Sequence, residues 1–116
     1  MQSSDLTGRH CRPCKEGEAP LAGDAANELL ACLHGDWSVD ETGGEISRTF
    51  SFNNYYQTMA FVNALAWVAH AEDHHPDIEV SYKRCHVRYS THAIGGLSEN
   101  DFICAAKLDA LLPGQS

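Results

Sequence analysis

Residues 53–76 read NNYYQTMAFVNALAWVAHAEDHHP, and this stretch decides the centre of the fold. Asparagine is a preferred N-cap residue, so Asn53-Asn54 predict a helix from about Tyr55 to Glu72. Large apolar side chains recur along this segment at the i, i+4, i+7 spacing of one buried helix face, at Phe61, Leu65 and Val68. The pattern therefore predicts one long helix that ends just before a histidine pair and a proline.

Strand-like segments lie in pairs on both sides of this helix. Before it, residues 37–39 and 46–52 flank Thr42-Gly43-Gly44, and a glycine pair suits the turn of a hairpin. Residues 46–52 alternate between apolar and polar side chains except at Arg48, which is typical of a half-buried strand. After the helix, residues 78–82 and 85–91 predict a second strand pair.

Shorter helices are predicted at both ends of this arrangement. Residues 28–33 form one, with Asp24 as N-cap and Gly35 as its stop. Ser98 and Asp101 have the spacing of a capping box and open the last helix, which ends before Pro113. The order αββαββα predicts an α+β fold, a four-stranded antiparallel sheet with helices packed on one face.

The ends of the chain and its charge set further expectations. Residues 1–23 are polar and aperiodic, so they predict a mobile arm or an extended wrap over a domain at residues 24–112. The net charge of −8 argues against direct nucleic-acid binding, because phosphate contacts need clustered lysine and arginine. The sequence has no apolar run of about 18–20 residues and no apolar secretory signal at its start, so we expect no membrane association and a cytoplasmic location.

Histidines provide the main chemical signal. His74-His75-Pro76 follows the long helix, and His92 ends a strand-like run sixteen residues after Pro76. Imidazole titrates near neutral pH, so such a cluster indicates proton transfer or metal binding. Proline holds the preceding residue extended, which should splay the two adjacent imidazoles from one rigid corner.

Two other interpretations compete with proton transfer. His70 and His74 share one helix face, and a metal-dependent hydrolase could use them with His92. The zinc-protease motif places glutamate directly after the first histidine, whereas here Glu72 comes one position too late. The simplest alternative is that the histidines are exposed residues at a helix end, favoured there by the helix dipole.

Five cysteines make a complete set of intramolecular disulfides impossible. Cys32, Cys85 and Cys104 lie in periodic segments and are interpreted as small core residues. Cys11 and Cys14 form a Cys-x-x-Cys pair in the N-terminal arm. A zinc half-site or a redox pair is less favoured there than an incidental or structural use, because the segment has neither four ligands nor a thioredoxin-like context.

The spacing around the histidines resembles the signature of pterin-4a-carbinolamine dehydratases. His74-His75-Pro76 is followed after five residues by Tyr82, after nine more by His92, and after eight more by Asp101. Three further segments are similar to that family: Phe50-Ser51-Phe52, Phe61-Val62-Asn63, and Ser90-Thr91-His92 with Gly96-Leu97-Ser98-Glu99-Asn100-Asp101. The resemblance covers about residues 27–111, and the N-terminal Cys-x-x-Cys looks like bacterial members.

This resemblance implies the αββαββα fold and a specific reaction. The reaction is dehydration of 4a-hydroxytetrahydropterin to quinonoid dihydropterin, which recycles the pterin used by aromatic amino-acid hydroxylases. It uses no metal or organic cofactor. By position, the catalytic residues would be His74, His75 and His92. The residues expected to contact the pterin would be Asp73, Ser90, Thr91, His70 and Asp101, with orientation of a histidine as the other role considered for Asp73.

This chain departs from the pattern of animal members of the family at some positions. The resemblance also implies partners. Animal members carry tryptophan two positions after the proline, where this chain has Ile78, and glutamate where this chain has His70. Asp101 could serve the helix N-terminus more than the chemistry. Family members form homodimers or homotetramers, and some animal members bind a homeodomain transcription factor. A non-enzymatic coactivator or partner-binding protein of the same fold is therefore the alternative function.

Overall fold

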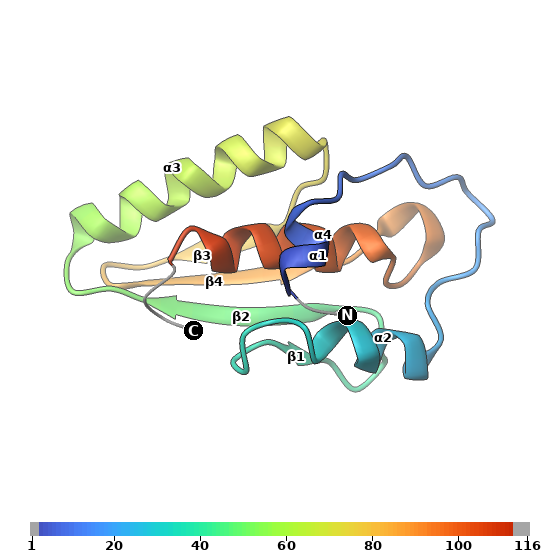
Figure 1. Ribbon diagram of the computed structural model, residues 1–116. Coiled ribbons are helices and arrows are strands. Elements are labelled where there is room, and N and C mark those ends of the chain that lie inside the picture. The colour runs from blue at the N-terminus through green and yellow to red at the C-terminus, as the bar shows by residue number, and fades with distance from the viewer. Residues whose placement is uncertain (1–2, 113–116) are drawn as a thin grey trace.

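The computed structural model describes residues 3–112, so Pro113 lies outside the described residues. The described part contains helices α1 (Ser3–Thr7), α2 (Gly23–Leu30), α3 (Tyr55–Glu72) and α4 (Glu99–Ala110), and a short 3-10 turn, η1 (His92–Ile94). Its strands are β1 (Ser38–Val39), β2 (Ile46–Ser51), β3 (Asp77–Val80) and β4 (Arg84–Tyr89). They form one antiparallel sheet in the order β1-β2-β4-β3 (Figure 1).

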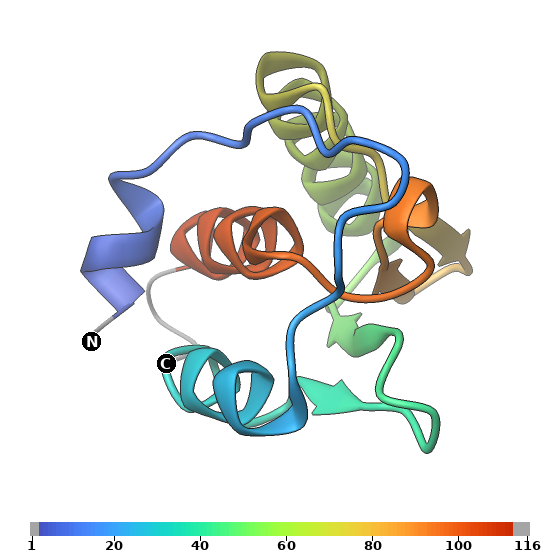
Figure 2. The ribbon, with the colours of Figure 1, turned by 90° about the vertical axis from the view of Figure 1, so that its right-hand side faces the viewer.

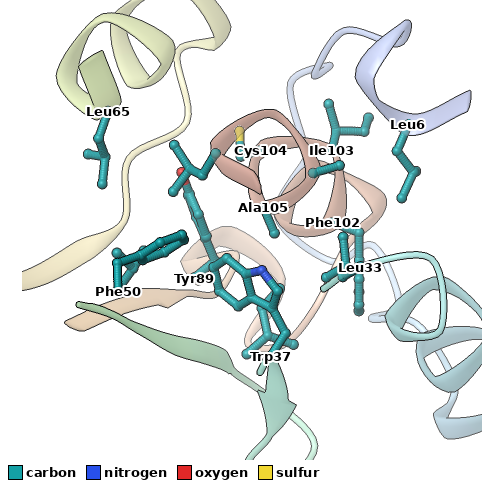
Figure 3. Close-up of a cluster of buried hydrophobic side chains, with 14 of the residues drawn as sticks. Leu6, Leu33, Trp37, Phe50, Leu65, Tyr89, Phe102, Ile103, Cys104 and Ala105 are labelled. Carbon is teal, nitrogen blue, oxygen red and sulfur yellow. The ribbon is translucent and has the colours of Figure 1, made fainter. Parts of the chain in front are cut away.

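One face of the sheet carries the core. The inward side chains of β2 and β4 are buried, and they are Ile46, Arg48, Phe50, Cys85, Val87 and Tyr89. Helices α2, α3 and α4 lie over this face, and residues such as Phe102 and Ile103 of α4 complete the core (Figures 2 and 3). The predicted α+β fold, with helices packed on one face of a four-stranded antiparallel sheet, is confirmed.

Helix α3 has the predicted bounds because its first turn is capped. The Asn54 side chain accepts a hydrogen bond from the Gln57 backbone N–H at 2.9 Å. Phe61 and Leu65 are buried as predicted, and the Phe61 ring lies 4.4 Å from that of Phe50, centroid to centroid. Val68 is only half-buried. In the last turns the buried position is instead Ala69.

Some predicted boundaries are wrong. Helix α2 begins at Gly23 with Ala22 at the N-cap, so Asp24 lies in the first turn and caps nothing. Strand β4 ends at Tyr89, two residues earlier than predicted, and His92 begins the η1 turn. The chain leaves the sheet there because Thr91 pairs with Gly96 in an isolated bridge, which closes a tight loop.

Arg48 interrupts the apolar pattern of β2 yet is buried, and Asp109 of α4 explains this. The guanidinium donates to the Asp109 carboxylate at 2.7 Å and also lies 4.1 Å above the Phe50 ring. Asp109 accepts from the Trp37 indole N–H at 2.8 Å as well. A buried charge is tolerated when it is paired and hydrogen-bonded, so this contact ties the sheet to α4.

The N-terminal residues wrap over the domain. Leu6 of α1 is fully buried against α4, and the segment that follows runs past the end of α3 to reach α2 (Figure 2). Helix α1 was not predicted because a five-residue helix has no periodicity to reveal it. Of the two expectations for this arm, the structure shows the extended wrap. Within residues 3–112, no helix is both long and apolar enough to cross a bilayer.

Candidate active site

A cavity of about 300 Å³ opens where four segments meet. The turn between α3 and β3, the segment after β4, the N-terminal segment and the start of α4 each contribute to its wall. The lining residues from the first two are Asp73, His74, His75, Ser90, Thr91, His92 and Ala93. The structure therefore brings together all three histidines that the sequence singled out.

A left-handed residue shapes the first of these segments. Asp73 is the C-cap of α3 with φ of 51°, the only non-glycine residue with positive φ among residues 3–112. Its N–H and that of His74 both turn back toward the Ala69 carbonyl. Strained conformations of this kind cost of order 1–3 kcal/mol and concentrate at functional sites. The change of chain direction at Asp73 places the His74 side chain inward, whereas His75 stays exposed.

His74 is fixed by Asp101, a fully buried residue in the first turn of α4. The His74 Nε2 lies 2.6 Å from Asp101 Oδ1, and its ring stacks on Tyr89 at 5.8 Å between centroids. The other carboxylate oxygen accepts from the Thr91 hydroxyl at 2.8 Å and from the Ser98 N–H at 3.0 Å. A carboxylate can only accept, so His74 Nε2–H donates to it, which sets the tautomer of the ring.

His75 and His92 are in a different situation. Both are exposed on the cavity wall, and among the described residues neither side chain has a hydrogen-bond partner. A neutral imidazole without a partner offers one N–H donor and one acceptor nitrogen to a bound molecule. These two rings can therefore exchange protons with a substrate, whereas His74 is held in place.

The remaining predicted site residues divide into two groups. Asp73, Ser90 and Thr91 line the cavity, and Asp101 lies beneath it in contact with His74. His70 does not line it, since its ring packs against exposed Trp67 at 5.4 Å. The metal site that would combine His70, His74 and His92 is not assembled, and residues 3–112 contain no group of three histidine, cysteine or acidic side chains that could hold a metal ion.

Five cavity residues were not predicted. They are Ala93 next to His92, Asn100 from the start of α4, and Arg12, Pro13 and Cys14 from the N-terminal segment. The Cys-x-x-Cys pair was the only signal in that segment, and the favoured interpretation was an incidental or structural use. The structure places Cys11 with its Sγ 3.5 Å from that of buried Cys104, while Cys14 lies on the cavity wall.

Glu72 holds the N-terminal segment next to the site. Its side chain is only 5% exposed and accepts from the Cys11 N–H at 2.7 Å and from the His10 ring at 2.9 Å. Burial opposes the charged form, but these two bonds and the ammonium of Lys107 outweigh it, so the pKa of Glu72 is lowered. A lowered carboxyl pKa stabilises the fold above the unfolded-state pKa of about 4.3 and stops doing so as pH falls through the lowered value.

We therefore expect Glu72→Gln to destabilise the protein at pH 7 and to destabilise it less at pH 3. The loss at pH 7 should be about 1–3 kcal/mol, the range for hydrogen bonds to a charged group. Urea unfolding at both pH values measures it. Glu79→Gln is the control, because Glu79 also pairs with a basic residue, Arg88, but is exposed, so its loss should be much smaller. Equal losses for the two variants at pH 7 would contradict the role of Glu72.

Comparison with known proteins agrees with this geometry. The family model described as "Pterin 4 alpha carbinolamine dehydratase" matches residues 19–111. A protein of Nitrosomonas eutropha named "Putative pterin-4-alpha-carbinolamine dehydratase" is 62% identical, covering 93% of this chain and 94% of that protein. A Legionella pneumophila protein of the same name is 53% identical over 95% and 97% of the two chains.

Solved structures show the same relationship. A "transcriptional coactivator/pterin dehydratase" from Brucella melitensis superimposes with a TM-score of 0.75 at 30% identity, over 79% of this chain and 97% of that one. A "pterin dehydratase-like protein", described as a RuBisCO assembly factor in the alpha-carboxysome, superimposes with a TM-score of 0.61 at 27% identity. That superposition covers 72% of this chain and 95% of the other. By its sequence, its fold and the cavity its histidines line, this chain belongs to the pterin 4 alpha carbinolamine dehydratase family.

Proposed function

We propose that this protein is a hydro-lyase that dehydrates a 4a-hydroxytetrahydropterin to the quinonoid dihydropterin by histidine acid–base catalysis. One observation carries the proposal: His74, His75 and His92 line a single cavity, with one ring anchored and two without partners. Membership of the family supplies the class of substrate.

The reaction needs one acid and one base. Hydroxide is a poor leaving group, so an acid protonates the 4a-oxygen as the C4a–O bond breaks and its electron pair leaves with the oxygen as water. A base takes the proton of a ring N–H, and the electrons left on nitrogen form the new π bond of the quinonoid ring. Imidazole suits both steps because it can donate a proton in its charged form and accept one in its neutral form.

The geometry suggests how the residues share this work. His75 and His92 exchange protons with the substrate, while His74, held by Asp101, presents its remaining nitrogen as a fixed hydrogen-bonding group. Asp73, Ser90 and Thr91 supply polar contacts to the pterin ring. We do not include His70, because it does not line the cavity.

The family also suggests partners. We propose that the chain forms a homodimer or homotetramer, since all four residues of the edge strand β3 are exposed and an unpaired edge can pair across a two-fold axis. An aromatic amino-acid hydroxylase would supply the hydroxypterin. We propose a cytoplasmic location and no metal or organic cofactor for this reaction.

The direct test is dehydration of a freshly generated 4a-hydroxytetrahydropterin, followed by absorbance in a stopped-flow instrument. We expect the purified protein to accelerate it well beyond the spontaneous rate, with no loss of activity in a chelator such as EDTA. A rate equal to that of buffer alone, from a folded protein, would instead favour a non-enzymatic partner-binding role, as the descriptions of the two structural neighbours suggest.

A further inference from the structure

The strap, defined as residues His10–Cys14, lies outside the part of the chain that matches the family model, which starts at residue 19. It nevertheless supplies Arg12, Pro13 and Cys14 to the wall of the histidine cavity. Figure 2 shows the segment that contains it running from α1 past the end of α3 and the η1 turn before it descends to α2. The cavity thus has a wall that does not come from the matched domain.

Asn100 holds the strap by binding both the backbone N–H and the backbone carbonyl of one residue, Arg12. Its side-chain oxygen accepts from the Arg12 N–H at 3.1 Å, and its side-chain N–H donates to the Arg12 carbonyl at 2.6 Å. The same amide nitrogen lies 3.5 Å from the Cys14 Sγ. Asn100 is 5% exposed, so replacing it leaves backbone groups of the strap without these partners.

The other anchor is Glu72, which holds His10 and Cys11 as described above. Each anchor is next in sequence to a residue of the site: Glu72 precedes Asp73, and Asn100 precedes Asp101. The strap is therefore fixed to the two turns that position His74.

The chain remains packed after the strap. The Leu21 N–H donates to the Leu97 carbonyl at 2.8 Å. A Cβ at Gly96 would meet the Pro20 ring at 2.7 Å, so the close approach of Pro20 requires glycine there. Contacts on both sides thus hold the strap against the cavity, which gives its side chains a defined place on the wall.

Arg12 is the one lysine or arginine among the residues that line this cavity, in a chain of net charge −8. Its backbone is clamped, but its side chain is 65% exposed and its contacts with Glu18 are long, at 3.4–3.5 Å. The His74 side chain, in contrast, is only 12% exposed. If the reacting carbon binds at the histidines, the more exposed guanidinium would face the substituent of the pterin ring.

We propose that the strap is the outer wall of the substrate pocket and that Arg12 is a specificity-determining residue, donating hydrogen bonds to oxygen atoms of the pterin side chain at ring position C6. This inference rests on the proposed pterin substrate. A guanidinium presents five N–H donors and suits a side chain that carries hydroxyl groups. A pterin with only a methyl group at C6 gains nothing from Arg12.

The unmodified protein offers a first test, by alkylation of its cysteines with iodoacetamide and quantification by mass spectrometry. Cys14 lines the cavity, and Cys32, which is also partly exposed but does not line it, is the internal control. We expect saturating 7,8-dihydrobiopterin to slow alkylation of Cys14 at least fivefold and to leave Cys32 unchanged. Cys11 should react slowly throughout, because its contact with Cys104 and its burial raise the pKa of its thiol.

Kinetics of Arg12→Ala provide the second test. We expect KM for a substrate with a dihydroxypropyl side chain to rise about tenfold and kcat to change less than twofold, because the lost contact is the same in the ground and transition states. KM for the 6-methyl substrate should not change. Lys15→Ala is the matched control, since it removes a neighbouring exposed cation that does not line the cavity.

Two results would overturn the inference. One is equal alkylation of Cys14 with and without the pterin, and the other is a KM or pterin Kd for Arg12→Ala within twofold of that for Lys15→Ala. Binding and alkylation do not require turnover, so these results are separate from the proposed function. The protein could fail to dehydrate the hydroxypterin and still show protection of Cys14 by the pterin and a pterin Kd that depends on Arg12. That outcome would refute the proposed activity and support the proposed role of the strap in pterin binding.

Discussion

His75→Ala and His92→Ala should each reduce kcat for hydroxypterin dehydration by about 10²–10⁴-fold, the usual loss for a general acid or base. Both rings line the cavity, and neither has a side-chain partner among the described residues, so each is available to exchange a proton with the substrate. Neither variant should unfold the protein, since both side chains are exposed. Single-turnover kinetics and a thermal unfolding curve measure the two expectations.

His70→Ala is the matched control for these variants. It removes an imidazole four residues before His74, but from the exposed face of α3 beside Trp67. We expect its kcat to stay within about threefold of wild type, as for a residue outside the site. The pH dependence of the residual activity assigns the roles, because loss of the acid removes the alkaline limb of a bell-shaped profile and loss of the base removes the acidic limb. Full activity in either cavity variant would contradict the proposed mechanism.

The elements that the sequence predicted well are those fixed by local signals. Helix α3 has the predicted bounds because a capping asparagine and an i, i+4 apolar spacing both lie within it. The capping box of Ser98 and Asp101 is present as predicted. Arg48 looked like an exception to its strand because its partner, Asp109, is 61 residues away and belongs to another element.

In the candidate site, too, the features with local sequence signals were predicted and those that depend on distant contacts were not. The spacing of His74, His75 and His92 predicted which side chains converge, since each follows the end of α3 or β4 within three residues. The strap could not be predicted, because its position depends on Glu72 and Asn100, which bind its backbone and carry no pattern of their own. The link between Asp101 and His74 was also hidden, because a capping residue has a sufficient local role and needs no second one.

Asp101 joins the fold to the chemistry, and two substitutions separate these roles. Asp101→Ala removes the acceptor for His74 Nε2, the Thr91 hydroxyl and the Ser98 N–H at once, in a position with no exposure. Breaking a buried, charged hydrogen-bond network in this way costs about 3–5 kcal/mol. Glu99→Ala, in the same first turn but part-exposed and paired with Arg9, should cost less than about 1 kcal/mol. Chemical denaturation of the three proteins measures these losses.

Asp101→Asn keeps the shape and should instead change the chemistry. The amide oxygen can still accept from Thr91 and Ser98, which leaves the amide N–H₂ facing His74, where it donates to Nε2. The ring must then carry its proton on Nδ1, so the face that it presents to the cavity changes from acceptor to donor. We expect activity to fall about 10–100-fold, as for other residues that orient a functional histidine, with a smaller loss of stability than in Asp101→Ala. Nitrogen-15 NMR of the histidine rings reports the tautomer directly. If Asp101 only caps α4, the tautomer and kcat of Asp101→Asn will match wild type, and the coupling of this carboxylate to the reaction will be refuted.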